Sequence, residues 1–179
     1  GSAGRELSQG EVGHVCFRGP QTFLGYVGAP EATARTISTD GYLYTGDLGA
    51  RDERGLRFAG RAKWVIKPSG YQVFPGQIES HFCELDEKVA ACGVVGVEHN
   101  LFSEGIVAFV ERKPDTDLSP TELKRYARGL PSFMRPLHYV VLDPGGMPLN
   151  RIAKTDYLRL AEMARREVDQ LRAARKWDR

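Results

Sequence analysis

The sequence has no apolar run long enough to cross a lipid bilayer, and its N-terminus lacks the charged and apolar regions of a secretory signal peptide. Cysteine is rare: Cys16, Cys83 and Cys92 are an odd number, without CxxC spacing or a histidine at ligand spacing. Neither a disulfide framework nor a zinc site is therefore indicated, and no other metal site is expected. We expect a protein of the reducing cytoplasm without a membrane span.

An excess of charge of one sign is also missing. The formal net charge is +2, which gives no reason to expect a nucleic-acid partner. The 179 residues are 41% apolar and 27% charged, a content typical of a globular protein that buries a core. This length accommodates one large domain or two small ones.

The first third of the chain is expected to be β-rich. Apolar and polar residues alternate between glycines over residues 10–28 and again over 41–61, which predicts short strands, with a single helical turn from Pro30 between them. Residues 52–55 have the composition of a turn that returns the strand antiparallel. A segment of about 60 residues makes a marginal domain, so we expect it to belong to something larger.

The rest of the chain mixes strand and helix patterns. A strand pair is predicted over 64–67 and 71–74, followed by a helix after Pro75. The fully apolar runs 94–97 and 106–110 are typical of central strands. A small sheet is therefore expected in this part, and the chain as a whole is assigned to the α+β class.

Two further helices and a fourth strand follow. Ser119, with Glu122 three residues later, predicts an N-capped helix, residues 139–142 predict a strand, and Thr155 is expected to cap the last helix. The closing stretch 172–179 is highly charged. We expect it to be a frayed, solvated helix end rather than a nucleic-acid arm.

One carboxylate and one guanidinium stand at the predicted hairpin of the first third, as Asp47 within YTGDL and Arg61 after a glycine. A carboxylate that accepts hydrogen bonds from two neighbouring hydroxyls, beside a planar donor, holds a ribose in a fixed orientation. The alternative is ordinary turn chemistry, in which glycine supplies a positive φ and aspartate bonds its own backbone. The local pattern leaves both interpretations open.

Five short segments follow one another along the chain, and each is weak by itself. They are YTGDL at 44–48, Gly60-Arg61, IKPSGYQV at 66–73 with Pro75 and Glu79, LPSFMRP at 130–136, and PLNRIAKTD at 148–156. In this order and at these intervals they resemble the carboxyl-terminal third of the AMP-forming adenylating superfamily, which includes acyl-CoA synthetases, firefly-type luciferases and the adenylation domains of peptide synthetases. The resemblance covers nearly everything from Gly10 to about Leu160.

The resemblance implies an enzyme that activates a carboxylic acid with ATP, as an acyl-adenylate, and then passes the acyl group to the thiol of CoA or of a carrier-protein pantetheine. The cofactors implied are ATP or AMP, Mg²⁺ and CoA. Residues 1–62 would be the β-rich edge of the large N-terminal domain, and residues 63–179 the small mobile C-terminal α+β lid domain. The N-terminal domain of the same enzyme is then the lid's partner.

Residue roles in the first half-reaction carry over where the motifs match. Asp47 would bind the ribose hydroxyls of AMP or ATP with the assistance of Arg61, and Tyr44 and Gln72 would contact the same nucleotide. Lys154 would be the catalytic lysine of adenylation. Arg151 lies in the same loop and has similar chemistry, so the residues alone do not separate these two cations; the motif does.

A second group of residues would act at the hinge and in acyl transfer. Lys63 would sit at the hinge where the lid rotates, and Ser69 and Gly70 would face the pantetheine arm, which a glycine allows to pass close to the backbone. Lys67 resembles the lysine that luciferase-like members use in their second step. A strand lysine that points to water is the alternative for this position.

Three positions depart from the family pattern. Ala153 stands where the family usually has glycine before the catalytic lysine, which is expected to stiffen the loop. Gln72 occupies a position where several members carry a phosphate-contacting arginine, and Lys63 replaces the aspartate that is common at the hinge. None of these departures breaks the assignment.

Two segments that ATP binding in this family requires are missing from the sequence: a Ser/Thr/Gly-rich phosphate loop and an aromatic-Gly-x-Thr-Glu segment. The family's acyl pocket also lies in the N-terminal domain. The chain is therefore interpreted as a fragment of an ATP-dependent acyl-CoA ligase, which is inactive alone. Two alternatives are an enzyme that loads a carrier-protein pantetheine and a non-catalytic module that binds a partner, although the intact Asp47, Arg61 and Lys154 argue against the second.

Overall fold

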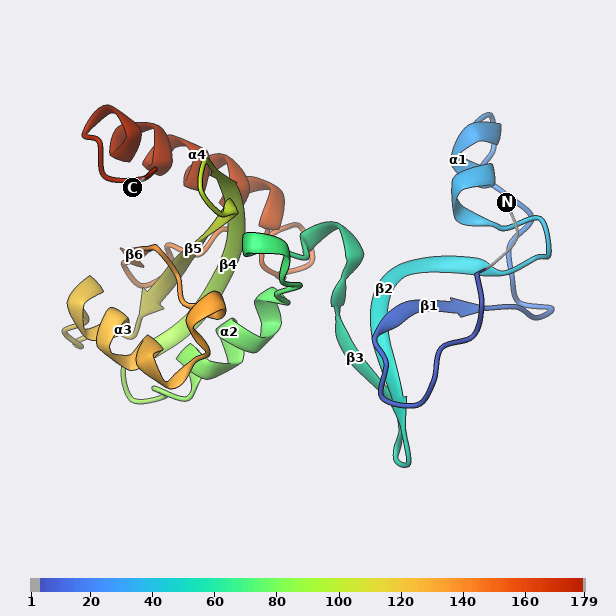
Figure 1. The fold of residues 1–179 in the computed structure, drawn as a ribbon, viewed down its shortest axis with the longest axis horizontal. Helices are drawn as coiled ribbons and strands as arrows, with labels where there is room; N and C mark the ends of the chain where they lie inside the picture. The colour runs from blue at the N-terminus through green and yellow to red at the C-terminus, as the bar shows by residue number, and fades with distance from the viewer. Residues whose placement is uncertain (1–3, 179) are drawn as a thin grey trace. The chain divides into compact units, whose positions relative to one another are not determined.

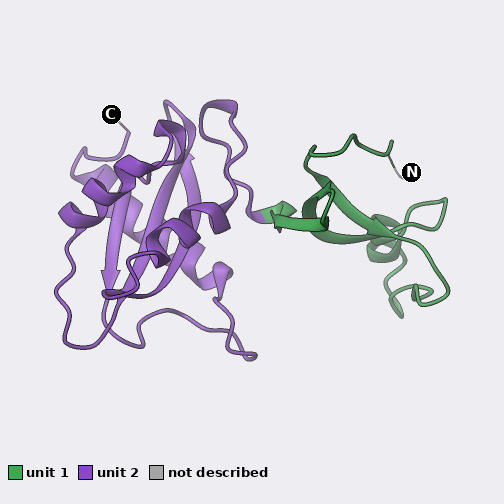
Figure 2. Cartoon of the chain, turned by 90° about the horizontal axis from the view of Figure 1, so that it is seen from below, with its two compact units in different colours: residues 1–63 green, residues 64–179 purple. Residues whose placement is uncertain are grey.

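A computed structural model of the chain describes residues 4–178 and divides between Lys63 and Trp64 into two compact units (Figure 2). Each unit contains a three-stranded sheet together with helix, which confirms the predicted α+β class (Figure 1). A short 3-10 helix, η1 (Ala62–Trp64), lies at the boundary. The two units are described separately below.

The first unit is a meander of three antiparallel strands with one short helix. Its elements are β1 (Gly13–Phe17), α1 (Pro30–Thr36), β2 (Leu43–Asp52) and β3 (Gly55–Arg61), and the strand order is β1-β2-β3. The turn predicted at 52–55 is confirmed, because β2 and β3 pair as a hairpin in which Asp52 Oδ1 accepts the N–H of Arg54 at 2.8 Å. The α1 helix begins at the predicted proline and runs for seven residues, longer than one turn.

The strand expected beyond Phe17 does not form. Residues 18–28 contain turns instead, one of which is closed by the Thr22 N–H donating to Gly19 O at 3.0 Å. Pro20 inside this turn has no backbone N–H to give to a sheet. The aromatic residues that made the stretch look like a strand, Phe23 and Tyr26, pack on each other with ring centroids 5.0 Å apart.

The second unit is a mixed three-stranded sheet covered on both faces by helices (Figure 1). Its elements are η2 (Pro68–Gly70), α2 (Pro75–Cys83), β4 (Val89–His99), β5 (Ser103–Arg112), α3 (Pro120–Tyr126), η3 (Ala127–Gly129), η4 (Ser132–Met134), β6 (His138–Leu142) and α4 (Tyr157–Ala173). The strand order is β4-β5-β6, with the first pair antiparallel and the second parallel. Both apolar runs therefore form strands as predicted, but only β5 is central, and β4 lies at the edge.

Alternation along β4 and β5 sends neighbouring side chains into two separate apolar clusters. Val94 and Ile106 face the cluster under α2 and α3, whereas Val95 and Val107 face the cluster under α4. All four side chains are at most 3% exposed. A strand buried on both faces reads as a continuous apolar run, which is why the sequence signal was strong.

The α2 helix presents the apolar face that its sequence predicts. Ile78 and Phe82 are fully buried one turn apart, and Leu85 packs partly buried against the same cluster. The predicted cap of α3 is also confirmed, since Ser119 Oγ accepts the N–H of Glu122 at 3.2 Å. Each apolar side chain of this size, when fully buried, contributes about 1.5–3 kcal/mol relative to exposure.

The strand pair predicted over 64–67 and 71–74 is reduced to a single bridge. Ile66 and Val73 exchange backbone hydrogen bonds at 2.9 and 2.8 Å, and η2 fills the space between them. Pro68 cannot donate to a ladder, and the next two residues have φ values of 50° and 84°, outside the extended region. The segment is therefore a tight turn closed by one bridge.

Both expectations for the last helix were wrong in detail. The cap of α4 is Asp156 rather than Thr155: the Asp156 carboxylate accepts the N–H groups of Leu158 and Arg159 at 3.1 and 3.2 Å. The closing stretch is not a frayed helix end either. The helix stops at Ala173, and Trp177 then returns to the core, where it is 4% exposed. Arg179 lies outside the described residues.

Candidate functional site

Asp47 and Arg61 form an ion pair across the β2–β3 hairpin. They are register partners, and Arg61 Nε lies 2.9 Å from Asp47 Oδ1. Arg61 Nη1 also donates to the backbone carbonyl of Thr45 at 3.1 Å, so the guanidinium is held at two points. The Asp47 side chain is 30% exposed. The carboxylate is thus oriented by a planar donor and still reaches solvent, as a ribose-binding group must.

The backbone around this pair is shaped by Gly46 and a bulge. Gly46 has a φ of 78°, and a Cβ there would lie 3.3 Å from Arg61 Nη1. The Thr45 hydroxyl accepts the Asp47 N–H at 3.0 Å and donates to Val15 O at 2.9 Å, which ties the site to β1. The register shifts after Leu48, where a bulge re-aims the strand beside the pair. Turn chemistry is therefore present, together with the ion pair.

Tyr44 lies in the same strand, half-buried, and packs edge-on against His14 with ring centroids 5.7 Å apart. This contact orients the ring from β1. The first unit therefore brings together Asp47 and Arg61 directly, and places Tyr44 three residues along β2.

The second group of candidate residues lies in the turn around η2. Ser69 is in the left-handed region at φ 50° and ψ 33°, and Gly70 follows at φ 84°. A Cβ at Gly70 would meet nothing within 4 Å, so the backbone there is open on that side. Ser69, Gly70 and Gln72 are exposed. The turn thus presents bare backbone at the surface, which suits a narrow flexible ligand such as an extended thiol-bearing arm.

Two contacts hold this turn against the β4–β5 hairpin. The Ser69 N–H donates to Phe102 O at 2.7 Å, and the Lys67 N–H donates to Glu104 Oε2 at 2.5 Å. The Lys67 side chain is exposed, as is Lys63 at the boundary.

Lys154 stands on a small loop that Asn150 closes. Asn150 Oδ1 accepts the N–H groups of Ile152 and Lys154 at 3.0 and 3.1 Å, and the Asn150 N–H donates to Lys154 O at 2.8 Å. Ala153 within the loop has a φ of 55°, a conformation in which a glycine carries no Cβ penalty. Lys154 is exposed, two residues before the Asp156 cap of α4. The loop therefore displays an ammonium group from a defined backbone.

A partly buried carboxylate, Glu79, ties the start of α4, which follows this loop, to the rest of the second unit. The Tyr157 hydroxyl lies 2.7 and 2.8 Å from the two oxygens of Glu79, and Glu79 Oε1 also accepts the N–H of Val94 at 2.9 Å. Burial raises the pKa of Glu79, although these two hydrogen bonds oppose the rise. The pKa of Tyr157 is raised too, by its own burial and then by the negative charge of Glu79. Glu79 thus joins α2, β4 and the start of α4.

Glu79 stands in one of the motifs, but the sequence alone gives it no role and does not indicate Tyr157 as its partner. The signal that could have found the pair is a carboxylate on the helix face that also carries Ile78 and Phe82, both fully buried. A partly buried carboxylate requires hydrogen-bond partners.

Within residues 4–178, no helix is long and apolar enough to cross a membrane. Over the same residues, no group of three or more His, Cys, Asp or Glu side chains is placed to hold a metal ion.

Comparison with known proteins finds a family that matches part of the second unit. Residues 77–154 match the family described as AMP-binding enzyme C-terminal domain. That match contains most of α2, the whole three-stranded sheet and the loop that ends at Lys154, and it stops before α4. The second unit therefore contains an AMP-binding enzyme C-terminal domain, and the ordered motifs of the chain resemble the AMP-forming adenylating superfamily.

Two of the curated proteins that the chain resembles are CoA ligases. The chain is 37% identical over 138 residues to 4-coumarate–CoA ligase 2 of Oryza sativa subsp. japonica, covering 76% of this chain and 24% of the relative. It is 35% identical over 160 residues to the 3-[(3aS,4S,7aS)-7a-methyl-1,5-dioxo-octahydro-1H-inden-4-yl]propanoyl:CoA ligase of Mycobacterium tuberculosis, covering 88% of this chain and 31% of the relative.

Among solved structures, ATP-bound MatB from Rhodopseudomonas palustris matches with a TM-score of 0.83 and 32% identity, over 89% of this chain and 32% of MatB. The chain therefore spans about a quarter to a third of the length of the proteins it resembles.

Proposed function

We propose that this chain is the carboxyl-terminal part of an AMP-forming acyl-CoA ligase, in which a carboxylic acid and ATP give acyl-AMP and pyrophosphate, and the acyl group then passes to the thiol of CoA. The observation that carries this proposal is the match to the AMP-binding enzyme C-terminal domain, which runs to Lys154 itself. In this structure that lysine is exposed on a loop closed by Asn150.

The role proposed for Lys154 follows from the charge that adenylation creates. Attack of the carboxylate on the α-phosphate builds negative charge on that phosphate and on the leaving pyrophosphate. A cation that is delivered only in the reactive arrangement lowers this barrier without tightening ground-state binding. Lys154 on the lid, beyond the hinge proposed at Lys63, fits such delivery. Arg151 lies in the same loop and is exposed, so the two cations require separate tests.

The role proposed for Asp47 is to accept the two ribose hydroxyls of ATP or AMP. Its support is the ion pair with Arg61, which fixes the carboxylate, together with the side chain's 30% exposure. Tyr44 and Gln72 are proposed to contact the same nucleotide. Mg²⁺ would neutralise the phosphates and is assigned to groups of the N-terminal domain beyond this chain.

The pantetheine of CoA is proposed to pass beside Ser69 and Gly70, where the backbone is open.

CoA is preferred to a carrier protein as the acyl acceptor. Both curated relatives named above are CoA ligases. The Pro68–Pro75 stretch also resembles CoA ligases and luciferases more than peptide-synthetase domains. Lys67 is proposed as a further second-step residue on the same resemblance. The reducing cytoplasm expected from the cysteine pattern stays a prediction.

The experiment is to express the full-length protein and measure pyrophosphate exchange into ATP in the presence of a panel of aryl and alkyl carboxylic acids. CoA and a phosphopantetheinylated carrier protein are then offered separately as acceptors. We expect acid-dependent exchange followed by acyl-CoA formation, and no exchange by the 179-residue chain alone. Exchange by the isolated chain, or none by the full-length protein with any acid, would contradict the proposal. Acyl transfer to the carrier alone would move the assignment to the second class of acceptor.

A further inference from the structure

The C-terminal tail of the second unit is anchored in the core by Trp177. After α4 ends, Arg175 adopts a φ of 55° and the Lys176 N–H donates to Leu171 O at 2.7 Å, so the chain reverses. The indole is then buried in the apolar cluster that also contains Val97 and Val107. A Cβ at Gly105 would lie 2.5 Å from Trp177 Cζ2, so the absence of a side chain in β5 makes room for the ring.

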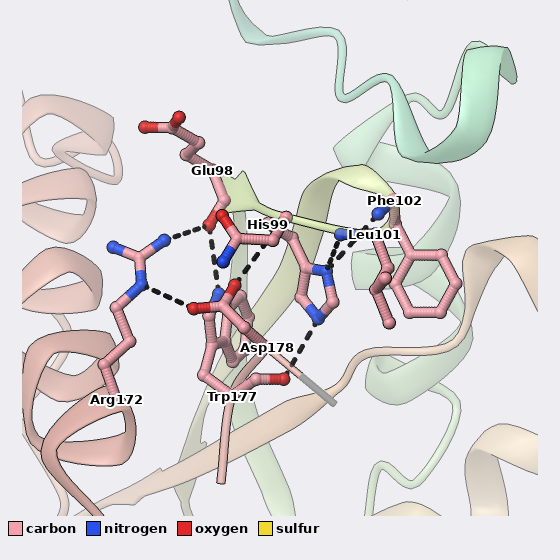
Figure 3. A network of polar contacts seen from close by, with 8 residues as sticks. Glu98, His99, Leu101, Phe102, Arg172, Trp177 and Asp178 are labelled. Carbon is pink, nitrogen blue, oxygen red and sulfur yellow. Dashed lines mark hydrogen bonds and ion pairs between the residues drawn. The ribbon is translucent and has the colours of Figure 1, made fainter. Parts of the chain in front are cut away.

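The tail also binds the end of β4 through polar contacts (Figure 3). Trp177 Nε1 donates to Glu98 O at 3.0 Å, and Arg172 Nη2 donates to the same carbonyl at 2.7 Å. Arg172 Nε lies 3.0 Å from Asp178 Oδ2, and Asp178 Oδ1 accepts the N–H of Asn100 at 3.0 Å. The tail therefore engages the β4–β5 turn with both backbone and side-chain groups.

His99 joins the tail to this turn with both ring nitrogens. Its Nδ1 accepts the N–H groups of Leu101 and Phe102 at 3.1 and 3.3 Å, so Nδ1 carries no proton. Nε2 is then the protonated nitrogen and donates to Trp177 O at 3.0 Å (Figure 3). The ring is 2% exposed and stacks on Phe102 with centroids 4.7 Å apart. Both ring nitrogens of His99 therefore have hydrogen-bond partners, one set in the turn and one in the tail.

The same turn carries the carbonyl that holds Ser69. Phe102 O accepts the Ser69 N–H at 2.7 Å. Ser69 and Gly70 are consecutive residues with positive φ, a backbone state that persists in a non-glycine residue only when its surroundings hold it. The position of Phe102 O is therefore part of what fixes the Ser69–Gly70 turn.

We propose that Trp177 and His99 are positioning residues for acyl transfer: the tail, through His99 and the β4–β5 turn, holds the Ser69–Gly70 backbone in the shape that the thiol-bearing arm requires. The expected effect on acyl transfer rests on the proposed function. The coupling between the tail and the Ser69–Gly70 turn rests only on contacts within the second unit. Displacements of about 1 Å at a site that orients a reacting group lower rates by as much as a hundredfold. A tail with no catalytic group thereby influences only the second half-reaction.

The coupling is tested in the 179-residue chain by amide hydrogen exchange at Ser69, measured by NMR. His99→Asn keeps an acceptor near the Nδ1 position but has no atom that reaches Trp177 O, so it cuts the hydrogen bond to the tail and keeps the acceptor for the turn. Because it also removes the ring that stacks on Phe102, its result is compared with that of Trp177→Ala, which leaves this stacking in place. Trp177→Ala removes the anchor, Trp177→Phe retains most of its packing, and Lys176→Ala changes an exposed neighbour as the matched control. We expect Ser69 to exchange about tenfold faster in the His99→Asn and Trp177→Ala variants. It should stay near the parent rate in the other two.

The consequence is tested in the full-length protein with the same variants. We expect His99→Asn and Trp177→Ala each to lower kcat/KM for CoA about tenfold while the rate of pyrophosphate exchange stays unchanged. Trp177→Phe should stay close to the parent value. If Trp177→Ala fails to fold, the His99→Asn variant decides. Ser69 exchange within twofold of the parent in a folded His99→Asn variant overturns the coupling. Faster Ser69 exchange with an unaltered kcat/KM for CoA overturns the positioning role. A parent enzyme that makes no acyl-CoA contradicts the proposed function instead and leaves the exchange result standing.

Discussion

Arg61 Nε lies 2.9 Å from Asp47 Oδ1, and the two residues are direct partners across neighbouring strands. The sequence left two interpretations open, a ribose-binding pair and ordinary turn chemistry, and the geometry contains the features of both. Gly46 and Thr45 supply the turn chemistry, since Gly46 has a φ of 78° and the Thr45 hydroxyl accepts the Asp47 N–H. The ion pair adds an oriented carboxylate, which turn chemistry does not require.

Asp47→Asn in the full-length enzyme is expected to reduce kcat/KM for ATP by roughly 10- to 100-fold, because a hydrogen bond to a charged group contributes about 1.5–3 kcal/mol. Pyrophosphate exchange at varied ATP concentration measures this. Asp52→Asn is the matched control, since Asp52 lies in the same hairpin and forms only the turn bond to Arg54 and a 4.0 Å contact with Arg57. Equal, small effects of the two substitutions would favour a structural role for Asp47.

Lys154→Ala is expected to reduce adenylation by at least a hundredfold while sparing thioester formation from a supplied acyl-adenylate, because the cation acts on charge that develops only in the first step. The two half-reactions are measured separately by pyrophosphate exchange and by CoA-dependent consumption of acyl-AMP. Arg151→Ala, in the same loop, should leave both nearly unchanged. A larger loss of adenylation in the Arg151 variant than in the Lys154 variant would reverse the assignment of the two cations.

Ala153→Gly is expected to raise the free energy of unfolding of the second unit by up to about 1 kcal/mol. Ala153 has a φ of 55°, which costs an L-residue about 1–2 kcal/mol, and the greater freedom of glycine in the unfolded chain offsets part of the gain. Urea unfolding of the 179-residue chain checks the sign. Asn150→Ala, which removes the acceptor of two loop N–H groups, should change stability in the opposite direction. A loss of stability in the glycine variant would show that the loop carries no such strain.

Glu79→Gln is expected to flatten the pH dependence of stability in the acid range. The folded-state pKa of Glu79 is raised, so the folded chain holds this proton more tightly than the unfolded chain, whose carboxyl titrates near pH 4.3. The stabilisation from that proton is present below the unfolded pKa and is lost as the pH rises through the raised folded pKa. The variant lacks this loss, and its stability relative to the parent should improve as the pH rises above the unfolded pKa.

Urea unfolding at several pH values from acid to neutral measures the effect, with Glu87→Gln as the control on an exposed carboxylate. Because Tyr157 donates to Glu79, the Gln variant is expected to keep a hydrogen bond at this place. Parallel stability curves for parent and Glu79→Gln would remove the argument that Glu79 is a desolvated carboxyl.

Local patterns predicted most of the elements because their causes are local. Alternation between glycines predicted the β2–β3 hairpin, and the spacing of Ile78 and Phe82 predicted α2. Ser119 caps α3 as expected. The same reasoning failed at 64–74, where Pro68 and two positive-φ residues replaced a strand pair with a turn and a single bridge. It also chose Thr155 over Asp156 as the cap of α4, since both residue types cap helices and only the backbone path distinguishes them.

The sequence by itself determined the α+β class, the family through its ordered motifs, and the candidate residues Asp47, Arg61 and Lys154, because periodicity and motif order are properties of the chain. Only the tertiary structure decided which groups meet. The carboxylate of Glu79 and the hydroxyl of Tyr157 are 78 positions apart in the chain and share hydrogen bonds, as do His99 and Trp177. A charged C-terminal stretch predicts solvation on composition alone. Residues 173–176 are exposed as that composition predicts, but the indole of Trp177 is buried against β5, because its packing contacts exist only once the sheet has formed.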